Sequence, residues 1–446
     1  MSMINAYSAA SEADVAQRER DMIARRQRLL GPAYRLFYAN PVHLVRGEGV
    51  WLYDPEGQAY LDMYNNVASV GHCHPHVTAA LSRQAEILNT HTRYLHDTVL
   101  DYAERLLGHF PLELSHVMFT CTGSEANDLA LRVAKAHTGG TGVIVTQLAY
   151  HGTTTVTAEL SPSLGRGMQL GAHARTVPAP DGYRGDVPDV GEVFAAHVRE
   201  AIGDMAASGI RPAALLVDTI FSSDGVYADP AGFLAPAVAA VREAGGLFIA
   251  DEVQPGFGRT GEAMWGFARH GLVPDIVTLG KPMGNGHPVA GMVARPEVLA
   301  EFGQRTRYFN TFGGNPVSAA VGMAVLEVIE GEGLVDNARR VGDHLRAGLR
   351  ALAQRHSIIG DVRGAGLFTG VELVRDPLTK EPATDETARL VNDLRERRIL
   401  ISATGPGANI LKIRPPLVFS RENADLFLSA MDDLLTRAAS ARSVHQ

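Results

Sequence analysis

The sequence predicts an α/β fold, in which a large domain has a mostly parallel sheet between helices and a smaller α+β domain follows. Short β-branched runs alternate with segments of helical spacing through most of the chain, which is typical of parallel sheets enclosed by helices. Beyond residue 330 this pattern gives way to a long amphipathic segment and several short apolar runs. The length of 446 residues also exceeds what one hydrophobic core usually organises.

We expect three parts along the chain. Residues 1–75 form an N-terminal segment that packs with the small domain, residues 76–330 form the large domain, and residues 331–446 form the small domain. The small domain begins and ends with a helix. The large domain contains six expected strands, each an apolar run, at 116–120, 142–146, 213–218, 247–251, 275–279 and 289–294.

Composition excludes several classes of partner. A formal charge of −8 and a pI near 6.1 argue against nucleic acid and against an anionic membrane. No apolar run approaches the ~20 residues that span a bilayer. The two cysteines, Cys73 and Cys121, are too few for a disulfide framework. Acidic residues interrupt the arginine-rich start, which argues against a transit peptide, so we expect a cytoplasmic protein.

Lys281 is one of only four lysines among the 41 basic residues, and it stands directly after the strand expected at 275–279 and Gly280. The sequence around Lys281 does not match either of two nucleotide-binding motifs. A P-loop requires a glycine and a hydroxyl residue where Asp275 and Pro282 stand, and a dinucleotide fingerprint requires its third glycine at Val289. Lys281 therefore needs another explanation.

The segment "GHCHPH" resembles a metal site because it gathers His72, Cys73, His74 and His76. However, no second pair of ligands follows at zinc spacing, and Pro75 is better placed as the first residue of a helix. We therefore predict no metal here, and we interpret the segment as a buried polar turn near a pocket.

A lysine in a desolvated or cationic site can act as a nucleophile, because its pKa is lowered and the neutral amine condenses with carbonyl groups. Pyridoxal phosphate presents an aldehyde to such a lysine, and it needs three further groups from the protein. These groups are a carboxylate at the pyridine nitrogen, a cradle for the phosphate, and an aromatic side chain against the ring.

The carboxylate and the cradle have candidates at the ends of expected strands. Asp251 ends the run 247–251, and the carboxyl ends of parallel strands face the ligand crevice, although an acidic residue there is often only a helix cap. Gly123 and Ser124 join strand 116–120 to a helix. Free amides at a helix N-terminus bind phosphate, and a plain capping turn is the alternative.

The ring also has two candidate contacts. Tyr150 follows the strand expected at 142–146 and can stack on the ring, although an isolated tyrosine more often only packs. Gln254, three residues after Asp251, can donate a hydrogen bond to the ring hydroxyl. The order of these residues on successive strand ends favours one shared cofactor site.

The segments "TGSEAND", "AYHG", "FIADEVQPGFGRTG", "DIVTLGKPMGNGHP" and "YFNTFGGNPVSAA" resemble, in this order, the class III aminotransferases, a family of fold-type I pyridoxal-phosphate enzymes. The resemblance runs from about Tyr34 to the final helix. It implies that Lys281 binds the cofactor aldehyde, that Asp251 pairs with the pyridinium, and that residues 76–330 bind the cofactor. It also implies further cofactor contacts from Gly123, Ser124, Tyr150 and Gln254.

In this family the active site lies between two subunits. The resemblance therefore implies a homodimer, or a tetramer of two such dimers. It also implies that Thr311, in "NTFGGNP", reaches the cofactor phosphate of the neighbouring subunit.

Within the family, four segments are most similar to the branch that contains ethanolamine-phosphate phospho-lyase: "YLDMYNNVASVGHCHPHV", "TRYLHD", "GKPMGNGHPVAG" and "ILKIRPPLVF". One position departs from the usual family pattern. Asp218-Thr219 stands where members usually carry Glu-Pro. In aminotransferases that glutamate commonly partners a substrate-switching arginine, so its replacement argues against the usual handling of two carboxylate substrates.

We therefore expect a lyase that eliminates phosphate from a small phosphorylated amine such as phosphoethanolamine. The alternative is an ω-aminotransferase that moves an amino group between an amine or amino acid and a keto acid. A cationic cradle for the departing phosphate would favour elimination. Arg414 is the first candidate, followed by Arg93 and Asn66, although each can be structural and Arg414 can equally bind a carboxylate. Lys281 and Asp251 argue against a third hypothesis, a catalytically silent binding protein.

Overall fold

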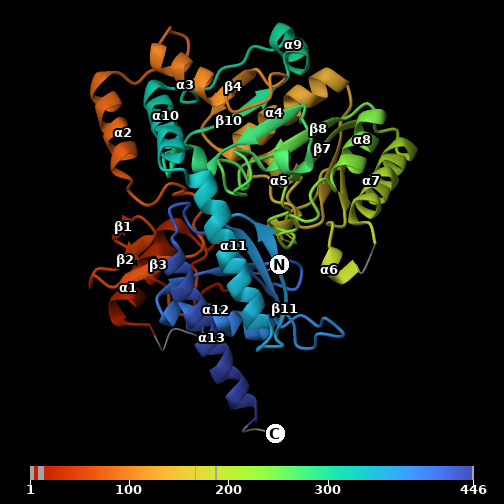
Figure 1. Ribbon diagram of the computed structural model, residues 1–446. Coiled ribbons are helices and arrows are strands. Elements are labelled where there is room, and N and C mark those ends of the chain that lie inside the picture. Colours follow the sequence, from red (N-terminus) through yellow and green to blue (C-terminus); the bar gives the residue numbers. More distant parts are fainter. Residues whose placement is uncertain (1–4, 9–14, 166, 186–187, 444–446) are drawn as a thin grey trace.

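The computed structural model describes residues 5–8, 15–165, 167–185 and 188–443. Figure 1 shows a large sheet with its helices in the upper part and smaller sheets in the lower part, with α11 (Leu334–Ala353) running between them. None of the helices in these ranges is long and apolar enough to cross a membrane.

The large sheet contains the six expected strands and one more. It consists of β4 (His116–Thr120), β5 (Gly142–Thr146), β6 (Ala174–Val177), β7 (Pro212–Asp218), β8 (Leu247–Asp251), β9 (Ile276–Leu279) and β10 (Ala290–Ala294). The strand order is β4-β10-β9-β8-β7-β5-β6, and β10 is antiparallel to both neighbours while the pairs from β9 to β6 are parallel. The prediction of a mostly parallel sheet is confirmed. Sequence reasoning missed β6, in which only the first and last residues are buried.

Helices cover both faces of this sheet because the side chains of each strand alternate between the faces. In β7, Ala214 and Leu216 pack in a cluster with α4 (Gly123–Thr138) and α9 (Pro296–Arg305). Leu215 and Val217 pack in another cluster, with α7 (Val190–Ala207) and α8 (Ala235–Glu243). A third group of helices packs together beside the sheet: α2 (Pro75–Ile87), α3 (Asp97–Leu107) and α10 (Pro316–Gly331).

The C-terminal part contains an antiparallel sheet of β11 (Ile359–Ala365), β12 (Phe368–Leu373), β15 (Ile410–Ile413) and β14 (Ser402–Thr404). Three helices belong to this part: α11, α12 (Thr384–Glu396) and α13 (Arg421–Ser443). The N-terminal helix α1 (Gln17–Leu30) is followed by β1 (Arg46–Glu48), β2 (Trp51–Tyr53) and β3 (Ala59–Asp62). Because β3 pairs in parallel with β13 (Ile399–Leu400), the two ends of the chain share one sheet.

The sheet topology brings the candidate site residues together. The carboxyl ends of β5, β7, β8 and β9 lie at one edge, since these strands are parallel, and β4 points the same way because it is antiparallel to β10. Lys281 follows β9, Asp251 ends β8 and Tyr150 follows β5. This is the edge where open α/β sheets bind their ligands.

Candidate active site

Lys281 lies at the junction of three cavities of about 310, 460 and 380 Å³. Its amine makes no hydrogen bond or ion pair with any residue in the described ranges. Burial, and then the neighbouring Arg414 guanidinium, lower the pKa of Lys281 to about 8, while Asp251 and Asp218 oppose the shift. The amine is therefore neutral, and nucleophilic, near neutral pH far more often than that of an ordinary lysine.

The first cavity brings together the predicted cofactor residues of one chain. Its lining includes Gly123, Ser124, Tyr150, Asp251 and Gln254 as well as Lys281. The other two cavities contain the substrate candidates: Asn66 and Arg414 line the second, and Arg414 also lines the third.

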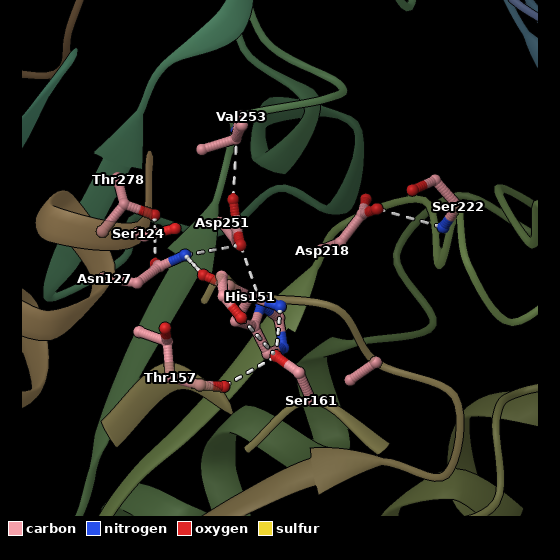
Figure 2. Close-up of polar contacts among 12 residues, drawn as sticks. Ser124, Asn127, His151, Thr157, Ser161, Asp218, Ser222, Asp251, Val253 and Thr278 are labelled. Atoms are coloured by element: carbon pink, nitrogen blue, oxygen red, sulfur yellow. Dashed lines mark hydrogen bonds and ion pairs between the residues drawn. The ribbon is translucent and has the colours of Figure 1, made fainter. Parts of the chain in front are cut away.

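Asp251 is held as a buried carboxylate (Figure 2). Its Oδ2 accepts from Nδ1 of His151 at 2.7 Å and from Nδ2 of Asn127 at 2.9 Å, and its Oδ1 accepts from the Val253 amide at 3.1 Å. Burial alone would raise the pKa of Asp251, but these hydrogen bonds outweigh it and lower the pKa. The side chain is therefore an anion inside the first cavity.

Sequence reasoning missed His151 and Asn127. Asn127 also donates to the His151 carbonyl at 2.8 Å, and its Oδ1 accepts from Thr278 at 2.7 Å, so its amide orientation is fixed. Nε2 of His151 is buried without a partner among the described residues. Both residues lie inside quoted motifs, "AYHG" and "TGSEAND", but only the fold places them on Asp251.

The turn before α4 leaves amides open for an anion. Thr122 caps the helix by accepting from the Glu125 amide, while Glu125 accepts from the amides of Cys121 and Thr122. This reciprocal cap does not use the backbone amides of Gly123 and Ser124, which belong to the first turn of the helix and can therefore donate to an anion.

A glycine keeps the space around this turn clear. Gly152 has a φ of +141°, and a Cβ there would lie 2.5 Å from Oγ of Ser124 and 2.7 Å from Oγ1 of Thr157. The residues therefore fit pyridoxal phosphate in three respects: an open turn for the phosphate, an anion for the ring nitrogen, and an unpaired amine for the aldehyde.

Gln254 links the cofactor cavity to the substrate cavities. Its Oε1 accepts from Nη1 of Arg414 and from Nδ2 of Asn66, the latter at 3.4 Å. Because arginine can only donate, the orientation of the Gln254 amide is fixed, and its Nε2 makes no hydrogen bond with the described residues. Tyr150, which is 38% exposed, lines both the first and the third cavity.

Arg93 and Thr311 lie outside these cavities. Both are exposed, and the Arg93 guanidinium lies 3.8 Å from the ring centroid of Phe309, in the loop that contains Thr311. The fold of one chain therefore does not bring Arg93 to its own Lys281.

The histidine-rich segment is only partly buried. The His72 side chain is 12% exposed and lies 2.7 Å from the buried Asp62, whereas Cys73 and His76 are exposed, so the prediction of a buried turn is wrong for these two residues. Nε2 of His74 lies 3.0 Å from Glu332 and Nε2 of His76 lies 2.5 Å from Glu327, near the C-terminal end of α10. These ring nitrogens are therefore paired with carboxylates. Among the residues described, no cluster of three histidine, cysteine or acidic side chains is arranged to hold a metal ion.

The fold and these contacts define an α/β enzyme built around a reactive lysine, a buried carboxylate and a phosphate turn. Comparison with known proteins identifies the family to which the chain belongs. The class-III aminotransferase family matches residues 37–435, and the chain belongs to this family. Its cofactor is pyridoxal phosphate and its fold is that of fold-type I enzymes, as the resemblance implied.

Individual relatives carry two kinds of name. A solved phospholyase from Arthrobacter in complex with phosphoethanolamine is 46% identical, with a TM-score of 0.90, and the match covers 93% of this chain and 99% of that one. The ethanolamine-phosphate phospho-lyase homolog 1 of Caenorhabditis elegans is 37% identical over 96% of both chains. The mitochondrial alanine-glyoxylate aminotransferase 2 homolog 2 of Arabidopsis thaliana is 40% identical over 92% of this chain and 86% of its own length.

Proposed function

We propose that this enzyme eliminates phosphate from a small phosphorylated amino alcohol, with phosphoethanolamine as the type of substrate. The observation that carries the proposal is the charge of the third cavity. Lys281, Lys412 and Arg414 line it, and no carboxylate of the described residues does. Such a cavity stabilises an anionic leaving group. The similarity to a phospholyase that binds phosphoethanolamine supports the same choice.

The phosphate must supply most of the ionic recognition, because phosphoethanolamine has no carboxylate. Arg414 is suited to this role. It is buried, its guanidinium lies 4.3 Å from the Tyr64 ring centroid, and its Nε has no partner among the described residues. Asn66 is 2% exposed and donates to the same Gln254 oxygen as Arg414, so it holds that oxygen toward the arginine.

We assign the chemical roles to this chain's residues as follows. When bound, pyridoxal phosphate withdraws electrons from the carbon that bears the substrate amine. Asp251 would hold the proton on the ring nitrogen, and the open turn at Gly123 and Ser124 would hold the cofactor phosphate. Tyr150 would lie against the ring, and Nε2 of Gln254 would donate to the ring hydroxyl. Lys281 would bind the aldehyde and, once freed, its amine would remove the proton from the carbon that bears the substrate amine.

Departure of phosphate then breaks the bond between the adjacent carbon and its oxygen, and the electron pair leaves with the phosphate. One water converts the remaining two-carbon amine to acetaldehyde and ammonia. No oxidant or reductant is needed, and the cofactor is unchanged at the end of each cycle.

Product analysis tests this proposal. With phosphoethanolamine as the sole substrate, the purified holoenzyme should release phosphate, ammonia and acetaldehyde in equal amounts without any keto acid. Free phosphate should inhibit competitively, since it would occupy the same cationic cavity. Steady exchange between alanine and pyruvate, with no phosphate release, would assign the enzyme to the aminotransferases instead.

The aminotransferase alternative has one specific observation in its favour. Arg414 can bind a carboxylate as well as a phosphate, and several relatives are named as alanine-glyoxylate aminotransferases or their homologues. In that reaction Lys281 would return the proton to the cofactor. Asp218 argues against an aminotransferase. It ends β7 beside Asp251, its side chain is shorter than the glutamate usual in the family, and its carboxylate accepts from the amides of Ile220 and Ser222. The carboxylate is thus bound to its own loop and, among the described residues, not to a substrate-switching arginine.

We also propose that the enzyme works as a homodimer, or as a tetramer of such dimers, in which Thr311 and Arg93 reach the neighbouring subunit's site. The support is an exposed apolar surface around these two residues, where His91 contacts the rings of both Tyr94 and Phe309. Large exposed apolar patches usually mark protein interfaces. Its members are exposed by 40–95%: Ile87, Leu88, Tyr94, Leu95, Phe309 and Phe312.

The dimer proposal predicts that Leu95→Asp gives inactive monomers. A charge at this position, where leucine is 95% exposed in the single chain, would be desolvated on association. Sedimentation velocity should show the loss of the dimer, and phosphate release should fall in the same variant. Leu378→Asp is the matched control, because Leu378 is 91% exposed on a loop remote from Thr311 in sequence. A wild-type enzyme that sediments as an active monomer would contradict the proposal.

We propose a cytoplasmic location on the grounds of the two free cysteines, Cys73 and Cys121, which suit a reducing compartment. Fractionation of the source cells tests this location, and enrichment in an organelle would contradict it.

A further inference from the structure

The third cavity, of about 380 Å³, has a composition that suits a dianion. Besides its three cations, it is lined by the hydroxyl side chains of Tyr64, Tyr150, Ser163, Ser223 and Thr404. Ser163 and Thr404 already donate to the carbonyls of Ala149 and Ser223. The hydroxyls of Tyr64, Tyr150 and Ser223, like the cations, can donate hydrogen bonds to phosphate oxygens.

Lys412 is a buried cation in this cavity whose charge no other described residue of the fold pairs. It lies on β15 and is 6% exposed. Its ammonium group makes no hydrogen bond or ion pair with any described residue, and lies 5.8 Å from the centroid of the Phe368 ring. A buried ammonium without a partner destabilises a fold. The buried arginines, by contrast, have oxygen partners: Arg259 donates to the Leu367 carbonyl, Arg346 to Asp343, Arg363 to Asp361 and Arg414 to Gln254.

The charged groups around Lys412 come from several elements. Arg414 and Lys281 disfavour its ammonium form, whereas Asp218 and Asp224 favour it. Burial has the largest effect, so the pKa of Lys412 is well below its usual value. Asp224 is engaged elsewhere, since it accepts from Thr146 and from the Leu148 amide. An arriving anion would therefore supply the partner that Lys412 lacks.

We propose that Lys412, together with Arg414, binds the phosphate group of the substrate and makes the site selective for phosphate dianions over carboxylates. This inference rests on the proposed function. The charge balance supports it. Lys281 must be neutral to react, whereas a bound phosphate dianion favours the ammonium form of Lys412. Lys412 and Arg414 then provide two cations for the two charges of the phosphate. A carboxylate would neutralise only one of them. Lys412 thus favours a substrate that can eliminate phosphate over one that can only exchange its amine.

Binding of inorganic phosphate to the holoenzyme tests the inference, because bound cofactor already fills the turn at Gly123. Isothermal titration calorimetry should show that Lys412→Met weakens phosphate binding about 10- to 100-fold, the usual effect of losing a charged hydrogen bond. The KM for phosphoethanolamine should rise together with this dissociation constant. Lys412→Arg should restore much of both, whereas Lys135→Met, at a lysine on α4 outside the three cavities, should change neither.

The methionine variant should fold, because it replaces an unpaired buried ammonium with an apolar side chain of similar length. If it does not, Lys412→Gln provides the same comparison with a polar side chain. Unchanged phosphate affinity in these neutral variants, or no phosphate binding by the wild type, would overturn the inference. Phosphate binding that depends on Lys412, without phosphate release from phosphoethanolamine, would uphold the subsite and refute the proposed lyase activity.

Discussion

Replacement of Lys281 with alanine should abolish turnover and leave the protein folded. Lys281 lies at the junction of the three cavities and supplies both the bond to the cofactor aldehyde and the amine that moves the substrate proton. Losing both functions should lower the rate at least ~10⁴-fold. Phosphate release and circular dichroism should be measured on the same preparations.

Two controls separate chemistry from structure. Lys281→Arg keeps a cation but cannot form the covalent bond, so it should be as inactive as the alanine variant. Lys135→Ala should retain full activity. Near-normal turnover by Lys281→Ala would mean that the cofactor assignment is wrong.

The stability of the cofactor-free protein gives an independent test of the lysine's environment. The pKa of Lys281 is about 8 in the folded chain and near 10.5 when unfolded. Between these values the unfolded chain binds more protons, so stability rises with pH across this window. In Lys281→Ala this rise should be smaller, although not absent, because the pKa of Lys412 is lowered too. Urea titrations across that pH range would measure the difference.

The large sheet was predictable because its central strands carry continuous apolar runs. β5 and β8 are buried at every position, and such apolar runs can be recognised in a sequence without knowing which strands they pair with. β6 was missed because two of its four residues are only partly buried. The pairing of β3 with β13 joins residues more than 300 positions apart, and no local pattern encodes it.

The site was predictable where residues follow strands directly. Lys281 and Asp251 could be placed from sequence because parallel strands align their carboxyl ends at one edge. Lys412 and His151 could not, since their roles depend on which distant segments face them. Lys412 reaches the site only because β15 of the C-terminal sheet borders the third cavity, and its lack of an ion pair among the described residues is a property of the folded chain.

Asp251→Asn should leave the cofactor bound but lower the rate by several orders of magnitude. The change removes the charge while keeping the shape. An asparagine can keep its oxygen toward Nδ1 of His151 and Nδ2 of Asn127, and it then loses only the bond from the Val253 amide. The loss of folding stability should therefore be about 1 to 3 kcal/mol, from that one unpaired donor.

The rate suffers far more, because a neutral amide does not hold a proton on the ring nitrogen, and an unprotonated pyridine withdraws electrons poorly. Phosphate release in single-turnover experiments should show the defect in the chemical step rather than in binding. Asp218→Asn is the matched control. It makes the same carboxyl-to-amide change at the end of the adjacent strand, in register with Asp251, and should cost much less. A loss below about tenfold in Asp251→Asn, roughly 1.4 kcal/mol of barrier, would mean that this carboxylate does not contact the ring nitrogen.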